Sequence, residues 1–212
     1  MISYFTISEN SSGIYEEKRS KFLSKAFHIE SVEEAKEIIL NVKKEYYDAR
    51  HNCYAYIIGE DKKQQKFFDD GEPSGTAGAP IIDAINKRDL TDVLIIVTRY
   101  FGGIKLGAAG LTRAYNKAAN IALDAAKIVK MQNFFNVKLT LDYNLLSNVE
   151  YYLRKENIRV KTSEYNENVA LNILVLSDKI EKVKNDIVEI SAGKILLEDA
   201  GEELVAVEVN NN

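Results

Sequence analysis

A glycine-rich stretch at residues 67–119 constrains the fold of this chain more than any other part of it. Seven of the 11 glycines and both prolines lie within it, and these two residue types mark turns and loops. Between its two glycine clusters, residues 93–97 form an apolar run that is too short for a helix and predicts a buried strand. The stretch therefore predicts two glycine-rich loops around one buried strand, each loop leading into a helix.

The second of these loops carries the features of an anion site. Gly102 and Gly103 allow positive φ angles and a close approach to the backbone. Apolar residues recur at helical spacing from about Gly107, and the free N–H groups at a helix start attract anions. We predict that RNA phosphates or another anion bind at Arg99, Gly102, Gly103, Lys105, Gly107 and Arg113. The alternative is that these glycines serve only tight turns and close helix packing.

The first loop has the same form. Ser74 or Thr76 is placed to cap a helix that runs through Ala84, so more free amides are expected beside Gly75. We therefore include Ser74, Gly75 and Thr76 in the predicted anion site. Neither loop contains a Walker motif or a GxGxxG dinucleotide motif, and we expect no cofactor.

Three carboxylates, those of Asp69, Asp70 and Glu72, precede the first loop. Carboxylate oxygens are the ligands that Mg²⁺ prefers, so these residues could hold that ion. Alternatively, they pair with nearby bases such as Arg99 or Arg113. We favour the pairing, because adjacency in sequence does not define metal-ligand geometry, and we predict no metal site.

His51 lies two residues before Cys53, a spacing that places both side chains on one face of a strand. Such a pair suggests a thiol nucleophile or a metal site, but the chain has no other cysteine and its other histidine, His28, is distant in sequence. We therefore discount both kinds of site. The residues expected to support the anion site are His51, Asp69, Asp70, Glu72, Arg19 and Lys21.

Outside the glycine loops, the N-terminal part shows a mixed pattern of elements. Residues 3–8 and 14–16 are strand candidates around a hairpin loop at residues 10–13, and residues 18–29 form a further strand. Ser31 and Glu34 form a capping box that starts a helix ending near Tyr47.

The sequence resembles the IMPACT family, also called the YigZ-like or UPF0029 family. The motifs that carry the resemblance read FFDDGEPSGTAGAPI and VTRYFGGIKLGAAGLTRAY, with HNCYAYIIG and KRSKF as flanking motifs. They span roughly the first 130 residues; Ala109 replaces an expected glycine and Thr112 an expected aliphatic residue. The resemblance implies a fold like ribosomal protein S5 domain 2, which also occurs in domain IV of elongation factor G.

Composition shifts at residues 127–133, which we interpret as a linker. The following segment has the order of a ferredoxin-like α/β sandwich, βαββαβ, and is similar to domain V of elongation factor G. We therefore expect an α+β protein with an S5 domain 2-like domain at residues 1–130 and a ferredoxin-like domain at residues 134–209.

Charge and composition narrow the class of protein. Residues 1–133 carry 19 basic and 18 acidic residues and the remainder 9 and 14, so any RNA contact requires a local patch. The single Cys53 excludes an internal disulfide and fits a reducing cytoplasm. No apolar run approaches the ~20 residues of a membrane span, and no signal peptide is apparent.

Eukaryotic members of the resembled family regulate translation under stress through protein partners and an extra domain, which we do not expect in this chain. The leading hypothesis is a non-catalytic cytoplasmic regulator of translation that binds RNA or the ribosome. A second is an enzyme that acts on a phosphorylated small molecule or nucleotide, with His51 as acid or base. A third is a protein-interaction adapter that uses exposed Tyr100 and Phe101 as anchors for a translation-related partner.

Overall fold

The computed structural model describes residues 3–209 and has two antiparallel sheets packed with helices, which confirms the α+β class. The chain divides into two compact units, here called the N-terminal unit, mainly residues 4–130, and the C-terminal unit, mainly residues 131–205. The boundary between them falls within three strands, β1 (Ser3–Ile7), β7 (Ile128–Leu141) and β10 (Leu196–Glu208), so most of the expected linker at residues 127–133 belongs to β7.

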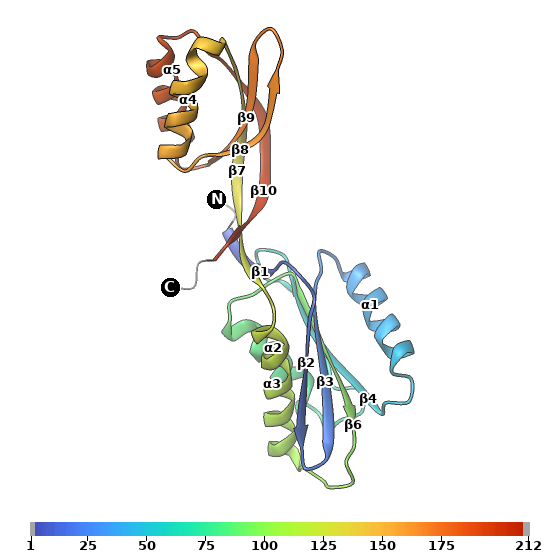
Figure 1. The fold of residues 1–212 in the computed structure, drawn as a ribbon. Coiled ribbons are helices and arrows are strands. Elements are labelled where there is room, and N and C mark those ends of the chain that lie inside the picture. The colour runs from blue at the N-terminus through green and yellow to red at the C-terminus, as the bar shows by residue number, and fades with distance from the viewer. Residues whose placement is uncertain (1–2, 210–212) are drawn as a thin grey trace. The chain divides into compact units, whose positions relative to one another are not determined.

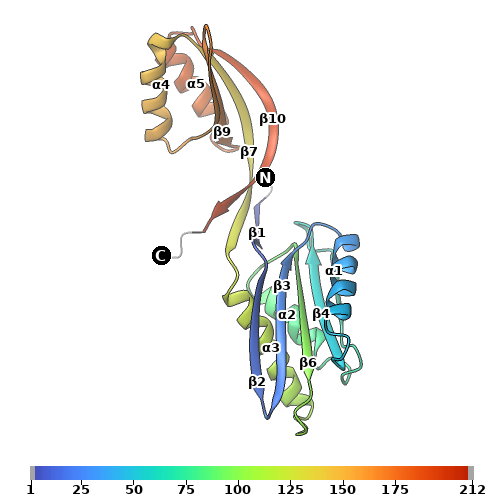
Figure 2. The same cartoon turned by 45° about the vertical axis from the view of Figure 1, so that its right-hand side comes forward.

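The N-terminal unit is built on one sheet with the strand order β2-β3-β6-β4-β5. From one edge of the sheet to the other, these strands are β2 (Ser11–Glu17), β3 (Ser20–His28), β6 (Val93–Tyr100), β4 (His51–Ile58) and β5 (Gln64–Phe68). Helix α1 (Val32–Glu45) covers one face, and helices α2 (Gly78–Lys87) and α3 (Ala108–Asp124) cover the other (Figure 1 and Figure 2).

The central strand β6 explains why the glycine loops enclose a continuous apolar run. Val93, Ile95 and Val97 pack into the core with α2 and α3, whereas Leu94 and Ile96 pack into the core with α1. A strand that is buried on both faces has no polar position to alternate with its apolar ones. The predicted buried strand is thus confirmed.

The predicted helix starts are confirmed for α1 and α3. Ser31 is the N-cap of α1 and its hydroxyl accepts a hydrogen bond from the Glu34 amide at 3.2 Å. The Glu34 carboxylate in turn accepts from the Glu30 amide at 2.8 Å, so the box closes one residue earlier than its usual form. Helix α1 ends at Glu45, two residues before the expected end.

The predicted hairpin at residues 10–13 is wrong. Strand β2 pairs with β3, and β1 (Ser3–Ile7) lies next to β7 in the other sheet. The turn between β2 and β3 consists of Lys18 and Arg19, with φ angles of 47° and 65°. Two residues of positive φ suit the twist of a tight hairpin, but asparagine and glycine normally occupy such positions, so lysine and arginine did not indicate a turn there.

The C-terminal unit has the expected element order β7-α4-β8-β9-α5-β10. The new elements are α4 (Tyr143–Lys155), β8 (Arg159–Tyr165), β9 (Val169–Leu176) and α5 (Ile180–Ser191). Val149 and Leu153 of α4 and Val183 and Ile187 of α5 pack with the sheet in one core. Within residues 3–209, no helix is both long enough and apolar enough to cross a membrane.

Candidate functional site

The motif residues meet at the end of the N-terminal sheet where α3 begins. Phe22 of β3, Arg99 of β6 and His51 of β4 are direct cross-strand neighbours in the register of the three strands. Paired positions share a face of a sheet, and Phe22 packs in the core with α2 and α3, so all three side chains lie on that face. Three distant segments of the sequence therefore supply one row of aromatic, cationic and imidazole groups.

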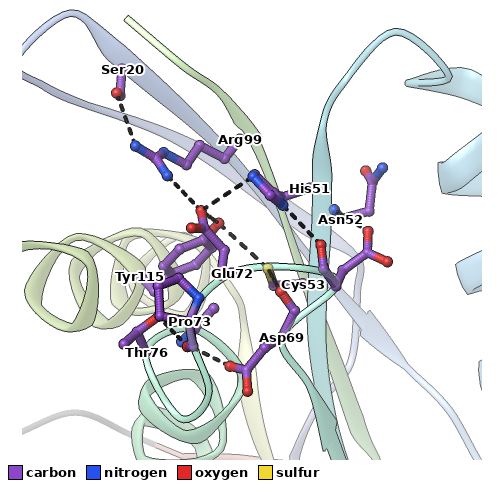
Figure 3. A network of polar contacts seen from close by, with 12 residues as sticks. Ser20, His51, Asn52, Cys53, Asp69, Glu72, Pro73, Thr76, Arg99 and Tyr115 are labelled. Carbon is purple, nitrogen blue, oxygen red and sulfur yellow. Dashed lines mark hydrogen bonds and ion pairs between the residues drawn. The ribbon is translucent and has the colours of Figure 1, made fainter. Parts of the chain in front are cut away.

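Arg99 is buried and forms an ion pair with Glu72. Its Nη1 donates to Glu72 Oε1 at 2.6 Å, and the hydroxyl of Tyr115 on α3 donates to the same oxygen at 2.8 Å (Figure 3). The Phe22 and Phe101 rings lie 5.5 and 5.6 Å from the guanidinium carbon. Only 5% of Arg99 is exposed and its two terminal nitrogens are engaged by Glu72 and Ser20, so a phosphate would have to displace these partners to bind them. Arg99 has a structural role here, and an RNA contact at this residue stays a prediction.

The first glycine loop is closed by a carboxylate of the chain itself. Asp69 accepts hydrogen bonds from the amides of Gly75, Ala77 and Gly78 at 2.9, 3.0 and 2.8 Å. These are the N–H groups that an external anion would need at the start of α2. The predicted anion site in this loop is therefore already filled by Asp69.

The predicted caps of α2 are wrong for the same reason. Ala77 is the N-cap of α2 and makes no side-chain cap bond. The Thr76 hydroxyl instead donates to the Pro73 carbonyl at 2.6 Å, and Ser74 is exposed. A full negative charge on Asp69 is a stronger acceptor for these amides than a neutral hydroxyl.

The remaining acidic residue of the predicted cluster has its own partners. Asp70 binds the Lys43 ammonium at 2.9 Å through one oxygen and the Asn52 amide at 2.7 Å through the other. Its backbone carbonyl accepts a hydrogen bond from His51 Nδ1 at 2.8 Å. The favoured pairing with bases thus holds for Glu72 and Asp70, and residues 3–209 contain no group of three or more acidic, histidine or cysteine side chains that could hold a metal ion.

Cys53 lies beneath this network and is not set up as a nucleophile. Its thiol lies 3.0 Å from the Asp69 carbonyl and 3.4 Å from the Tyr115 hydroxyl (Figure 3). Burial raises the pKa of the Cys53 thiol, and the nearby carboxylates of Glu72, Asp70 and Asp69 raise it further. The protonated thiol is the unreactive form, so this environment opposes nucleophilic catalysis.

The second glycine loop is fixed at its start and open at its end. The Gly102 amide donates to the Ser20 hydroxyl at 3.1 Å, and a Cβ at Gly102 would lie 2.0 Å from the Arg19 carbonyl carbon. Gly102 is therefore required for close packing against the hairpin turn. Gly103 and Gly107 have φ angles of 83° and 73° and are exposed.

Helix α3 starts without a side-chain cap. Its N-cap is Gly107, which has no side chain to accept a hydrogen bond from the first-turn amides. Ala108 and Ala109 follow it and are exposed, as is Lys105. The helix start that the sequence predicts as an anion site is therefore open to solvent here, in contrast to the start of α2.

Seven exposed basic residues gather on the segments around the start of α3. We call them the basic rim: Lys18, Arg19, Lys21, Arg50, Lys105, Arg113 and Lys117. Lys18, Arg113 and Lys117 line one hollow of about 280 Å³, and Arg50 and Lys105 line a neighbouring one; Leu106 borders both. None of the seven forms an ion pair with another residue between Ser3 and Val209.

Sequence reasoning selected Arg19, Lys21, Lys105 and Arg113 but left Lys18, Arg50 and Lys117 out of the site. Lys117 lies four residues after Arg113, a spacing that places both on one face of a helix. That periodicity was the available signal for Lys117. Arg50 directly precedes β4, and only the three-dimensional fold brings it to the start of α3.

The aromatic pair of the adapter hypothesis separates into two environments. Tyr100 is half-buried and its hydroxyl donates to Asp48 at 2.8 Å, which raises the pKa of the phenol to about 12. Phe101 is 49% exposed, and Ile104 in the same loop is 43% exposed. Of the two expected anchors, Phe101 therefore presents apolar surface to a partner, together with Ile104, and Tyr100 does not.

Comparison with known proteins gives consistent matches along the chain. The model of the Impact N-terminal domain matches residues 18–123, and that of a domain of unknown function, DUF1949, matches residues 139–194. The Bacillus subtilis IMPACT family member YvyE is 38% identical over 192 residues, which are 91% of this chain and 88% of that protein. The Escherichia coli IMPACT family member YigZ is 32% identical over 87% of this chain and 91% of its own length.

Two further matches mark how far the similarity extends. Rat Protein IMPACT is 30% identical over 113 residues, which are 51% of this chain and only 35% of the rat protein. A solved structure described as the crystal structure of an hypothetical protein is 31% identical and has a TM-score of 0.62, covering 93% of this chain and 97% of its own. The bacterial relatives thus match nearly end to end, and the rat protein matches over part of its length.

Proposed function

Because the chain belongs to the IMPACT family, we propose that it binds RNA, including ribosomal RNA, through the basic rim and thereby regulates translation. The observation that carries this proposal is the set of seven exposed basic side chains that lack acidic partners within residues 3–209. The link to translation rests on the resemblance to family members that regulate translation. A translation assay tests this link separately from RNA binding.

The clustering of the rim residues supports a binding role. Among the other basic residues of the same unit, Lys25, Lys43, Lys62 and Arg88 each pair with an acidic residue, and so does buried Arg99. Lys44, Lys66, Lys87 and Lys130 form no ion pair within residues 3–209 but line neither of the two hollows of the rim. An unpaired cation costs little in water and keeps its full charge for a partner. A local group of such cations attracts a polyanion even though the unit as a whole is nearly neutral.

The open start of α3 suits an anion such as a phosphate. Gly107 and Ala108 at this helix start line the same cavity as Lys105, and phosphate groups bind readily at uncapped helix starts. If four to six phosphates contact the rim, a plot of log affinity for single-stranded RNA against log salt concentration should have a slope of roughly −3 to −4.

The experiment is co-sedimentation of the purified protein with ribosomes and with separated subunits across a salt series. We expect salt-sensitive binding that is lost in a Lys105→Glu, Arg113→Glu and Lys117→Glu variant. The matched control changes three exposed basic residues outside the rim, Lys44→Glu, Lys66→Glu and Lys194→Glu. Equal binding by both variants, or equal loss in both, contradicts a role for the rim.

Binding to ribosomes alone does not establish regulation. A translation assay with purified components and a reporter message measures whether the protein changes the rate of synthesis. We expect the wild-type protein and the control variant to change the rate and the rim variant to have no effect. An effect that persists in the rim variant points instead to the exposed loop residues Phe101 and Ile104 and to a protein partner.

A further inference from the structure

A cavity of about 340 Å³ lies between the two glycine loops at the start of α3. Its walls are mostly apolar and include Pro73, Phe101, Leu106 and Leu111. Arg50 and Lys105 are its exposed cationic residues, and half-buried His51 and buried Glu72 and Arg99 contribute further polar groups. A phosphate ion needs only a fraction of this volume and gains nothing from apolar walls, so the cavity suits a larger ligand that is apolar at one end and anionic at the other.

Two polar groups beside this cavity lack partners within the chain. The Nε atom of Arg99 is buried and has no hydrogen-bond acceptor among residues 3–209, although its two other nitrogens are engaged. Both side-chain hydrogen bonds to Glu72 fall on Oε1, whereas Oε2 is accessible and accepts none within the same described range. A free and accessible acceptor at the cavity points to a ligand that carries a hydrogen-bond donor, while the buried Nε of Arg99 is out of reach of a ligand unless the pair shifts.

The rigidity of the surroundings favours binding without rearrangement. Asp69 fixes the first loop through three amides, and the contact of Gly102 with the hairpin turn fixes the second. The Arg99–Glu72 pair joins β6 to the first loop (Figure 3), and both residues line the cavity. A preformed cavity spares the ligand the cost of ordering its walls.

We propose that this cavity receives one nucleotide of a single-stranded RNA, with the base against the Phe101 ring and its phosphate at the α3 start beside Lys105. The proposal rests on the proposed function and names how RNA is held at the same surface. Phe101 is half-exposed, as an aromatic side chain that stacks with a base needs to be. Glu72 Oε2 can accept a hydrogen bond from the exocyclic amine of adenine, cytosine or guanine.

This arrangement predicts a preference among small probes. Adenosine 5′-monophosphate offers a base, an exocyclic amine and a phosphate, whereas ribose 5-phosphate and inorganic phosphate lack the base. Stacking of one base on an aromatic side chain contributes roughly 5- to 150-fold in affinity. The nucleotide should therefore bind at least about fivefold more tightly than either of the other two probes.

The test is an amide NMR titration of the full chain with these three probes. We expect adenosine 5′-monophosphate to shift the resonances of His51, Gly107 and Ala108, which line the cavity. Phe101→Ala should weaken this binding by about fivefold or more. Phe67→Ala is the matched control, because Phe67 is similarly exposed, at 48%, and does not line the cavity.

Three other outcomes overturn the nucleotide proposal. Inorganic phosphate that binds as tightly as the nucleotide would reduce the site to an anion site. Nucleotide binding that Phe101→Ala leaves unchanged would remove the stacking role. If no probe shifts these resonances while the rim variant still loses ribosome binding, the nucleotide pocket is wrong and the proposed function stands.

A different result overturns the proposed function. If the cavity binds the nucleotide and the rim variant sediments with ribosomes like wild type, the proposed function is wrong and the nucleotide pocket stands.

Discussion

The two glycine loops have similar sequences, but the helix start that follows the first loop is occupied by a carboxylate of the chain and the one that follows the second loop is open. In the first loop, Asp69 occupies the amides at the start of α2, and its own carboxylate takes the place of an external anion. In the second loop, the start of α3 at Gly107 has no side-chain cap and lies among exposed cations. The donor geometry of a helix start is thus common to both, and the presence of an internal acceptor decides which one can bind a ligand.

The comparison assigns different roles to residues that look alike in the sequence. Asp69, Glu72 and Arg99 hold the loops in place, whereas Lys105 and Arg113 face solvent. Charged residues in a motif can therefore be structural when they are buried and functional when they are exposed. Changes in the two groups should differ in whether stability or binding is affected.

The largest expected effect is the loss of stability when the link between the loops is broken. Glu72→Gln keeps the shape of the side chain but leaves the Arg99 guanidinium buried without an opposite charge. Removing one partner of a buried pair costs about 3–5 kcal/mol of unfolding free energy. Urea denaturation of the variant measures this cost, with exposed Glu16→Gln as the control. A loss below about 1 kcal/mol would show that the pair does not join the loops.

A smaller loss is expected from opening the first loop. Asp69→Ala removes the acceptor of three amide hydrogen bonds, of which the one from exposed Gly75 is replaced by water. The buried amides of Ala77 and Gly78 each cost about 1–3 kcal/mol when left unpaired, and we expect a total of about 2–3 kcal/mol because half-buried Asp69 leaves space for water when it is removed. Ser74→Ala should change stability by less than about 0.5 kcal/mol. Thermal and urea unfolding of both variants measure the two effects. A larger stability loss for Ser74→Ala than for Asp69→Ala would mean that Ser74 caps α2, as the sequence predicts.

These two variants also show where sequence reasoning reached its limit. The strand at residues 93–97 and the start of α3 were predictable, because apolar periodicity and glycine placement are local signals. Pairing between the acidic cluster and Arg99 was among the alternatives. The role of Asp69 was not predictable, because its carboxylate reaches amides six to nine residues ahead through the fold of the loop.

The hairpin error and the omission of Arg50 have a similar cause. Lys18 and Arg19 form a turn of positive φ without the residues that normally mark one, and close packing of Gly102 against Arg19 accompanies it. Arg50 joins the rim only after β4 is placed beside β6 in the sheet. Non-local packing thus determined the composition of the site.

The pH dependence of stability tests the environment of Cys53 between the loops. Burial raises the pKa of this thiol above its usual value of about 8.5, so the folded protein keeps a proton that the unfolded chain releases. Stability is therefore complete at neutral pH and falls as the pH rises above about 8.5. By linkage, this group removes about 2 kcal/mol of unfolding free energy between pH 7 and pH 10.

Cys53→Ala should lack this loss, whatever its stability at neutral pH. Urea denaturation of wild type and variant at pH 7, 8, 9 and 10 gives the difference directly, and tyrosine titration is common to both proteins and cancels. If the unfolding free energies of wild type and variant change with pH in the same way, the thiol ionises in the folded protein. That result would require water to reach the polar contacts around Cys53. Slow reaction of native Cys53 with a thiol reagent, compared with the urea-unfolded chain, provides an independent check.

The smallest expected effect on stability belongs to the second loop. Lys105 is exposed and has no ion-pair partner within residues 3–209, so Lys105→Glu should change the unfolding free energy by less than about 0.5 kcal/mol. The same change replaces a cation with an anion beside the open start of α3, where a negative charge opposes a bound phosphate. RNA affinity should therefore fall by about tenfold or more at low salt, and the difference from wild type should shrink as salt is added. A loss of stability comparable to that of Asp69→Ala would mean that both loops are closed by internal contacts, and the distinction between them would fail.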